Sequence, residues 1–405
     1  MVPDPTLDCM ETPVSQSRDD PRRNLAAVQA DIVAWLIGPA RRELSPEAIV
    51  LGLMERLTAA GIPIWRLRIG QRVANPMIGA WGVIWSRSEG VELYTVPRTV
   101  LDTSAYHGSP FQAVITTRKS VRQSLERLAP DAHSVYFELA AAGSTDYIAL
   151  PIEYGDGSVQ GAAFTIDRPG GFTENEVALI DALAPAISAA MEPAAMRHSM
   201  TSLLEVYLGV GPAGRVAGGA FRRGATTAMD AAVLVTDIRG YTPMSERLAP
   251  DALLETTGKH FEVVVDSVRA EGGDVLKFIG DGVLSIFPAE QGGRADACQR
   301  AARSVASAFD RGRSATPDLS FVAALHFGPV VYGNIGSVDR LDFTVVGPTV
   351  NFVSRLEAIS KALDKPAVCS ADVARSIPAD KARSLGRHAL KGFAEPQEVF
   401  ELATA

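Results

Sequence analysis

The sequence predicts an α+β protein with two folded domains, each built from helices and a largely antiparallel sheet. Its 405 residues are enough for about two or three domains of ordinary size. Helical segments are interleaved with short strand-like runs and hairpins, which is typical of the α+β class. The pattern changes at about residue 229, where a buried strand begins, and this change separates the two domains.

The composition is that of a soluble globular protein, with 47% hydrophobic and 21% charged residues. A net charge of −8 argues against general nucleic-acid binding but leaves room for a small nucleotide substrate. The three cysteines show no disulfide or zinc-site spacing, which fits a reducing compartment. The first residues lack the features of a signal peptide, and no apolar run reaches the roughly 18 residues that span a bilayer. We therefore expect a cytoplasmic protein without a membrane span.

The first domain is expected at residues 25–195, after a segment 1–24 whose Pro, Asp, Ser and Arg content predicts disorder. It begins with two helices, and Ser45 is the expected N-cap of the second, with Pro46 at its first position. Short strands follow, among them I-P-I-W-R-L-R-I, W-G-V-I-W and G-A-A-F-T-I. A sheet flanked by N- and C-terminal helices is thus predicted.

The last helix of this domain has a capping box, because Thr173 and Glu176 are three residues apart before an apolar run. With the preceding strands, the segment F-T-E-N-E-V resembles the end of a GAF-type sensory domain. The resemblance implies a regulatory domain with a small-molecule ligand, which it does not identify. Residues 196–228 are helical and then glycine-rich, and they are expected either to carry a signal or to act as a passive linker.

The second domain, residues 229–405, opens with the buried strand A-A-V-L-V-T-D-I and a long helix. A hairpin is expected around K-F-I-G-D-G, because Asp-Gly between two apolar runs is a strong turn signal. A helix and a further strand pair follow, formed by L-S-F-V-A-A-L-H-F-G and P-V-V-Y-G-N-I-G. The strand D-F-T-V-V then leads into the helix T-V-N-F-V-S-R-L-E.

Two aspartates are the candidate metal ligands. Asp237 ends the first strand of this domain, and Asp281 lies between glycines at the tip of the hairpin. If the two strands are neighbours, both carboxylates emerge at one edge of the sheet. Such a pair suits Mg²⁺ or Mn²⁺, and Gly240 and Gly280 would let backbone N–H groups approach a triphosphate. Each aspartate taken alone is more simply interpreted as a turn residue.

Asn351 and Arg355 are four residues apart and therefore share one face of a helix. An asparagine can orient a ribose, and an arginine can neutralise charge that develops on a phosphoryl group. Taken alone, the two could equally form a solvated helix face. The sequence contains neither a Walker-type phosphate loop nor the kinase motifs H-R-D and D-F-G.

Several motifs occur in a fixed order: T-D-I-R-G-Y-T, K-F-I-G-D-G-V-L-S-I-F, H-F-G-P-V-V-Y-G-N-I-G, F-T-V-V-G-P-T-V-N-F-V-S-R-L-E and L-K-G-F. Together they resemble the catalytic domain of class III adenylate/guanylate cyclases over residues 229–403. The resemblance implies a ferredoxin-like, palm-type fold and two metal ions held by Asp237 and Asp281, with help from the Ile238 carbonyl.

The resemblance also implies roles for the other candidate residues. Asn351 would position the ribose and Arg355 would stabilise the transition state at the α-phosphate. Further substrate contacts would come from Gly240, Tyr241, Thr242 and Lys391.

The resemblance further implies that the base-recognising pair of this family maps onto Lys277 and Thr344. A lysine donor satisfies adenine N1, whereas guanine N1 carries a hydrogen and favours an acidic partner. Many adenylate cyclases have Asp where this chain has Thr344, and this departure softens the selectivity for ATP over GTP.

The implied reaction is that of a phosphorus–oxygen lyase, in which the 3′-OH of ATP attacks the α-phosphate to give cyclic AMP and pyrophosphate. The family architecture implies a homodimer with shared sites: Asp237 and Asp281 from one chain, and Lys277, Thr344, Asn351 and Arg355 from the other. A guanylate or dual-specificity cyclase and a non-catalytic nucleotide-binding regulator are the alternatives. A diguanylate cyclase is disfavoured, because E-G-G-D-V at 271–275 lacks the Glu-Phe that would follow in that signature.

Overall fold

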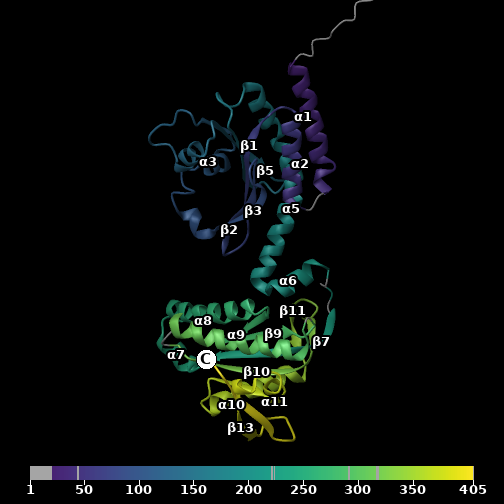
Figure 1. Cartoon of the computed structure of the whole chain (residues 1–405), viewed down its shortest axis with the longest axis vertical. Helices are drawn as coiled ribbons and strands as arrows, with labels where there is room; N and C mark the ends of the chain where they lie inside the picture. The colour runs from purple at the N-terminus through teal and green to yellow at the C-terminus, as the bar shows by residue number, and fades with distance from the viewer. Residues whose placement is uncertain are drawn as a thin grey trace, which may run out of the picture. The chain divides into compact units, whose positions relative to one another are not determined.

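The computed structural model describes residues 21–42, 45–219, 222, 224–290, 292–315 and 319–404. The segment predicted to be disordered lies outside these residues except for its end, where helix α1 begins at Pro21. The chain divides into two compact units, residues 1–200 and 201–405 (Figure 1). Helix α5 runs across this division, and each unit is described separately.

The first unit is an antiparallel sheet with helices on both faces. Its strands are β1 (Ile64–Arg72), β2 (Ile78–Ser86), β3 (Gly90–Pro97), β4 (Val121–Ser124), β5 (Asp146–Glu153) and β6 (Val159–Ile166). They lie in the order β3-β2-β1-β6-β5-β4, and every neighbouring pair is antiparallel. The helices are α1 (Pro21–Ile37), α2 (Pro46–Ala59), α3 (Pro110–Thr117), α4 (Ser134–Ala141) and α5 (Glu174–Leu208), with short 3₁₀ turns η1 (Ala40–Arg42) and η2 (Arg98–Asp102).

Two helix starts in this unit have the caps that the sequence predicts. The Ser45 hydroxyl accepts a hydrogen bond from the Ala48 N–H, with Pro46 at the first position of α2. At the start of α5, the Thr173 N–H donates to Glu176 and the Glu176 N–H donates to the Thr173 hydroxyl, at 2.7 and 3.3 Å. Both capping predictions are confirmed, since these bonds satisfy N–H groups that a helix start leaves free.

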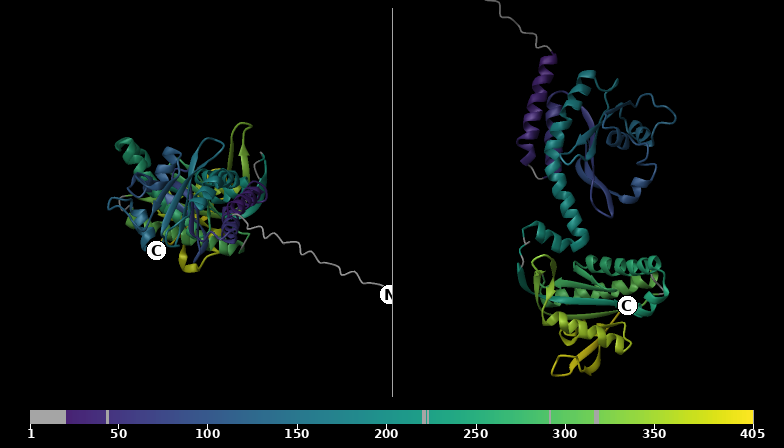
Figure 2. Two further views of the ribbon diagram at one scale, coloured as in Figure 1. Left: turned by 90° about the horizontal axis from the view of Figure 1, so that it is seen from above. Right: turned by 180° about the vertical axis from the view of Figure 1, so that it is seen from behind.

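The main core of the unit lies between the sheet and helices α1, α2 and α5, which lie side by side in Figures 1 and 2. Leu183, Ile187 and Met191 of α5 are buried in this core. Among the described residues, α5 is the one helix long and apolar enough to cross a membrane by length and composition alone, and half of its most apolar window is buried in the protein. The core helix of a soluble protein has the same character, so this finding is weak evidence for a span.

The second unit contains a larger sheet. Its strands are β7 (Thr226–Ile238), β8 (Asp274–Ile279), β9 (Gly282–Pro288), β10 (Phe321–Gly336), β11 (Leu341–Val346), β12 (Ala367–Ser370), β13 (Ala382–His388) and β14 (Gln397–Leu402). The order is β13-β14-β12-β10-β7-β9-β8, and β11 pairs with β10. The helices are α6 (Val210–Ala217), α7 (Tyr241–Arg247), α8 (Pro250–Ala270), α9 (Gly293–Ala315), α10 (Pro348–Ala362) and α11 (Ala371–Ala374), with the 3₁₀ turn η3 (Ala379–Lys381).

Each face of this sheet has its own hydrophobic core. Helices α8 and α9 cover one face, where Val264, Val268 and Val305 pack against β7, β9 and β10. Helix α10 covers the other face through Phe352, Val353 and Leu356 (Figure 1). Mixed helices and mostly antiparallel strands agree with the predicted α+β class, and β10 with β12 is the one parallel pair recorded among the described residues.

One predicted element of this unit is wrong. The two segments expected to form a strand pair are a single strand, β10, which continues through Pro329. One side of β10 pairs with β12 as far as Leu325 and with β11 from Val331 onward. Pro329 lies between these two stretches, where its missing N–H removes no bond to either strand. The proline therefore does not end the strand.

Candidate active site

Neighbouring strands bring Asp237 and Asp281 together at one edge of the second sheet. Strand β7 pairs with β9 so that Thr236 lies opposite Val283. Asp237 is the next residue along β7, and Asp281 lies in the turn just before β9. The structure thus fulfils the condition on which the two aspartates were expected to meet.

The hairpin K-F-I-G-D-G has the predicted form, with β8 and β9 antiparallel and Ile279 opposite Gly282. Gly280 has a φ of +63°, a conformation that costs other residues energy. A Cβ atom added at Gly282 would lie 2.9 Å from the Thr236 carbonyl oxygen and 3.2 Å from Asp237 Oδ1. The two glycines therefore let the turn bend tightly and let Asp281 approach the end of β7.

A cavity of about 330 Å³ lies at the two aspartates. Its walls include all the residues of the β7–α7 segment that were predicted to contact metal or substrate: Asp237, Ile238, Gly240, Tyr241 and Thr242. Asp281 completes the predicted set, and Arg239, Pro243 and Lys361 also line the space. Gly240 precedes α7 with a φ of +67°, so a glycine is favoured where β7 turns sharply into the helix.

Lys361 is a wall residue that sequence reasoning missed. Its ammonium group forms an ion pair with Asp237 Oδ2 and another, at 2.7 Å, with Glu357 Oε1. Lys361 lies in the last turn of α10, on the helix that also carries Asn351 and Arg355. The i, i+4 spacing of Glu357 and Lys361 could have indicated a surface ion pair, but no local signal places Lys361 against the end of β7.

The two carboxylates influence each other. Burial raises the pKa of Asp281, and the nearby carboxylate of Asp237 raises it further. Hydrogen bonds from the backbone N–H groups of Asp281 and Ile238 act in the opposite direction. Two carboxylates this close to each other at one cavity repel, and a cation between them would relieve that repulsion.

The carboxylate oxygens of Asp237 and Asp281 are ligands that suit Mg²⁺ or Mn²⁺. These ions prefer oxygen ligands and usually keep several water or phosphate oxygens in their coordination shell. The described residues contain no group of three or more His, Cys, Asp or Glu side chains that could enclose a metal. A metal ion held here by the two aspartates would therefore need further oxygens from the backbone, from water or from a substrate.

The predicted base-recognition residues lie elsewhere in the sheet. Lys277 is on β8, and its ammonium group forms an ion pair with Asp342 on β11. Thr344 is two residues further along β11 and is buried. Asp342 and Thr344 therefore share one face of the strand. Sequence reasoning missed Asp342. Its spacing of two residues from Thr344, which puts both on one face of a strand, was the signal that could have indicated it.

The structure does not bring the remaining predicted residues to the cavity. Asn351 and Arg355 are exposed on the same face of α10, as their spacing predicts, and Lys391 is exposed in the turn before β14. None of these three, and neither Lys277 nor Thr344, lines the space at Asp237 and Asp281 within the described part of the chain. A single chain thus presents the two groups of predicted residues separately.

The fold and the site define an α+β domain in which two aspartates meet at one edge of the sheet, next to a cavity. Residues 225–391 match the family described as the adenylate and guanylate cyclase catalytic domain. The C-terminal part of this protein therefore belongs to that family, and the resemblance expected from its motifs is confirmed. The resemblance of residues 25–195 to a GAF domain stays a prediction.

Curated relatives match part of the chain. An adenylate cyclase of Anabaena cylindrica is 29% identical over 171 residues, which is 40% of this chain and 34% of that protein. Adenylate cyclase 2 of Rhizobium meliloti is 30% identical over 179 residues, or 42% of this chain and 48% of that protein. This chain thus spans less than half of each of these relatives.

Solved structures resemble part of the chain as well. The adenylyl cyclase CyaB from P. aeruginosa is 24% identical, with a TM-score of 0.40, and the match covers 44% of this chain and 96% of that one. The guanylyl cyclase Cya2 is 27% identical, with a TM-score of 0.38, and the match covers 44% of this chain and 93% of that one.

Proposed function

We propose that this protein is an adenylate cyclase that converts ATP to 3′,5′-cyclic AMP and pyrophosphate. The observation that carries the proposal is the pairing of Asp237 and Asp281 at one polar cavity, within a domain of the cyclase family. The matched family includes both adenylate and guanylate cyclases, so the choice of ATP rests on Lys277 and Thr344.

The proposed reaction needs little covalent help from the protein, because both reacting groups belong to one substrate. Asp237, Asp281 and the Ile238 carbonyl would hold two Mg²⁺ or Mn²⁺ ions. When bound, these ions would activate the ribose 3′-OH and neutralise phosphate charge. The exposed Asn351 is free to orient the ribose, and the Arg355 guanidinium would balance the negative charge that develops at the α-phosphate.

Specificity for adenine is proposed to come from Lys277 donating to N1 and the Thr344 hydroxyl accepting from the amino group. The ion pair with Asp342 supports this role, because it limits the conformations of the Lys277 side chain. Since a threonine replaces the more selective aspartate, use of GTP as a second substrate is the alternative function.

The site is proposed to be completed by a second copy of the chain. The cavity at Asp237 and Asp281 contains none of the base- or ribose-binding residues, which is expected if a partner supplies them. Next to Lys277, the apolar side chains of Phe278 and Ile279 are 51% and 57% exposed, and such neighbours suit a protein interface.

Complementation tests the shared site. Asp281→Ala and Lys277→Ala proteins are each expected to be nearly inactive. Mixed after exchange of subunits, they should recover about a quarter of the wild-type activity, because half of the dimers are mixed and each mixed dimer has one intact site. No recovered activity in a mixture that contains heterodimers would contradict the shared site.

The activity itself is tested by incubating the purified protein with ATP or GTP and Mg²⁺ or Mn²⁺, with products identified by mass spectrometry. Cyclic AMP as the main product supports the proposal, and cyclic GMP as the main product refutes the argument from Lys277 and Thr344. No cyclic product with either nucleotide and either metal would favour a non-catalytic nucleotide-binding regulator. Control of the activity by the N-terminal unit and a cytoplasmic location remain part of the proposal.

A further inference from the structure

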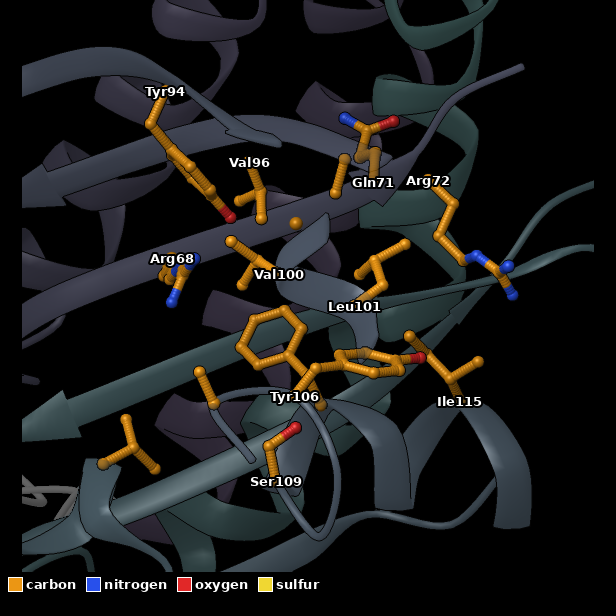
Figure 3. Close-up of a pocket in the computed structure, with 15 residues that line it drawn as sticks. Arg68, Gln71, Arg72, Tyr94, Val96, Val100, Leu101, Tyr106, Ser109 and Ile115 are labelled. Atoms are coloured by element: carbon orange, nitrogen blue, oxygen red, sulfur yellow. The ribbon is translucent and has the colours of Figure 1, made fainter. Parts of the chain in front are cut away.

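The first unit contains a cavity of about 110 Å³ on the face of its sheet opposite the main core (Figure 3). Strands β1, β2 and β3 form its floor, and η2, the following loop and α3 cover it. Its walls are mostly apolar, with Val96, Val100, Leu101 and Ile115 among the residues that line it. The ring of Tyr106 lies across the cavity in Figure 3.

Gly70, which lines the cavity, belongs to a row of glycines from three adjacent strands. Gly70 of β1 lies opposite Gly82 of β2 on one side and Gly161 of β6 on the other. A Cβ atom at Gly82 would lie 2.7 Å from the Tyr94 hydroxyl, and one at Gly161 would lie 2.5 Å from the Phe111 ring. This glycine row lets the rings of Tyr94 and Phe111, which line the cavity, lie directly on the sheet.

Two arginines place positive charge next to the apolar walls of this cavity. Arg66 and Arg68 are two residues apart on β1, so both project from the face that carries Gly70. No carboxylate of the described residues forms an ion pair with either side chain, and the buried Arg68 Nε has no hydrogen-bond partner there. The Arg68 guanidinium lies instead over the rings of Tyr94 and Phe111, at 4.5 and 5.4 Å from their centroids.

Within the described part of the chain neither guanidinium group has an ion-pair partner, and the Glu89 carboxylate acts on Arg66 only from a greater distance. Burial lowers the pKa of Arg66, and the neighbouring charge of Arg68 lowers it further. Burial raises the pKa of Tyr94, so its phenol is neutral and donates its proton to the Ile69 carbonyl oxygen. The contacts with the rings compensate only part of the lost hydration of a guanidinium group.

We propose that this cavity binds a small organic anion, a carboxylate on an apolar ring. The carboxylate would pair with Arg68, whose planar guanidinium suits two parallel hydrogen bonds, and the ring would lie among the apolar side chains. A smaller space of about 30 Å³, lined by both Arg66 and Arg68, shares Phe111 and Val135 with the cavity and has room for the charged end.

The size of the cavity limits the ligand. A cavity of about 150 Å³ holds a benzene ring in another protein, so a cavity of about 110 Å³ accepts at most one small ring. Inorganic phosphate would satisfy the arginines but leave the apolar walls without contacts. A neutral ring would fill the walls but leave the guanidinium groups without a counter-charge.

Isothermal titration calorimetry of the full chain with benzoate, benzamide and inorganic phosphate tests the proposal. Benzoate is expected to bind at one site per chain. Benzamide and inorganic phosphate are each expected to bind at least about tenfold more weakly, because benzamide lacks the negative charge and phosphate lacks the apolar ring. Equal binding of benzamide, equal binding of phosphate, or no binding of benzoate would overturn the proposal.

Two variants locate the site. Arg68→Met should weaken benzoate binding about tenfold or more while the protein stays folded, because it replaces an unpaired cation with an apolar chain of similar length. Arg56→Met is the matched control, since Arg56 also lies over an aromatic ring, at 4.0 Å from Trp35, but does not line the cavity. Unchanged benzoate binding in Arg68→Met would overturn the proposal. If that variant fails to fold, as judged by circular dichroism, Arg66→Gln takes its place with the same expectation.

Discussion

Replacing Lys361 with methionine is predicted to strengthen divalent-cation binding at Asp237 and Asp281. In the structure the Lys361 ammonium group is the cation next to Asp237, so a metal ion has to displace it or bear its repulsion. The Lys361 side chain is 41% exposed, and an ion pair with that exposure contributes at most about 1 kcal/mol. Because 1.4 kcal/mol corresponds to a factor of ten, we expect metal affinity to rise about two- to fivefold.

The measurement is a titration of the nucleotide-free protein with Mn²⁺, followed by the electron paramagnetic resonance signal of the free ion. Lys365→Met is the matched control, because Lys365 forms its ion pair with Glu401, away from the cavity, at 3.2 Å. Unchanged or weaker Mn²⁺ binding in Lys361→Met would refute the reasoning. That result would mean that Lys361 arranges the carboxylates rather than competing with the metal.

Three further predictions concern the same unit. Burial lowers the pKa of His260 to about 4 and leaves both ring nitrogens without partners, so the unfolded chain binds the proton first as the pH falls. The free energy of unfolding therefore falls by about 3 kcal/mol between about pH 6.5 and pH 4. Urea unfolding at pH 8 and pH 5 should show most of this loss in the wild type and little of it in His260→Leu. Asp342→Asn should raise the KM for ATP about threefold, because Lys277 loses its charged partner, and saturation kinetics that match the wild type would contradict this. Gly280→Ala should cost about 1 kcal/mol of stability in thermal unfolding and most of the cyclase activity, since the residue before Asp281 needs a positive φ.

The parts of the site that could be predicted are those fixed by local chemistry. Asp-Gly between two apolar runs specifies a hairpin tip wherever it occurs, and Asp281 lies at such a tip. The four-residue spacing of Asn351 and Arg355 puts both on one helix face in any fold. The Ser45 N-cap of α2 and the capping box at the start of α5 were predictable for the same reason.

The parts that could not be predicted depend on contacts between distant segments. Lys361 meets Asp237 across 124 residues, and Lys277 meets Asp342 across 65, and no local pattern encodes either contact. Pro329 misled the strand prediction, because a proline ends a strand only where its missing N–H faces a partner. Which side of a strand has a neighbour is a property of the sheet as a whole.

The β8–β9 hairpin carries Asp281 at its tip, Lys277 on one strand, and the exposed Phe278 and Ile279 between them. If one such hairpin contributes residues to two active sites of a dimer, the rate of catalysis depends on how much of the protein is dimeric. Below the dissociation constant of the dimer, activity per chain should fall in proportion to dilution, so total activity grows with the square of the protein concentration. The abundance of the protein in the cell would then control its output without any ligand.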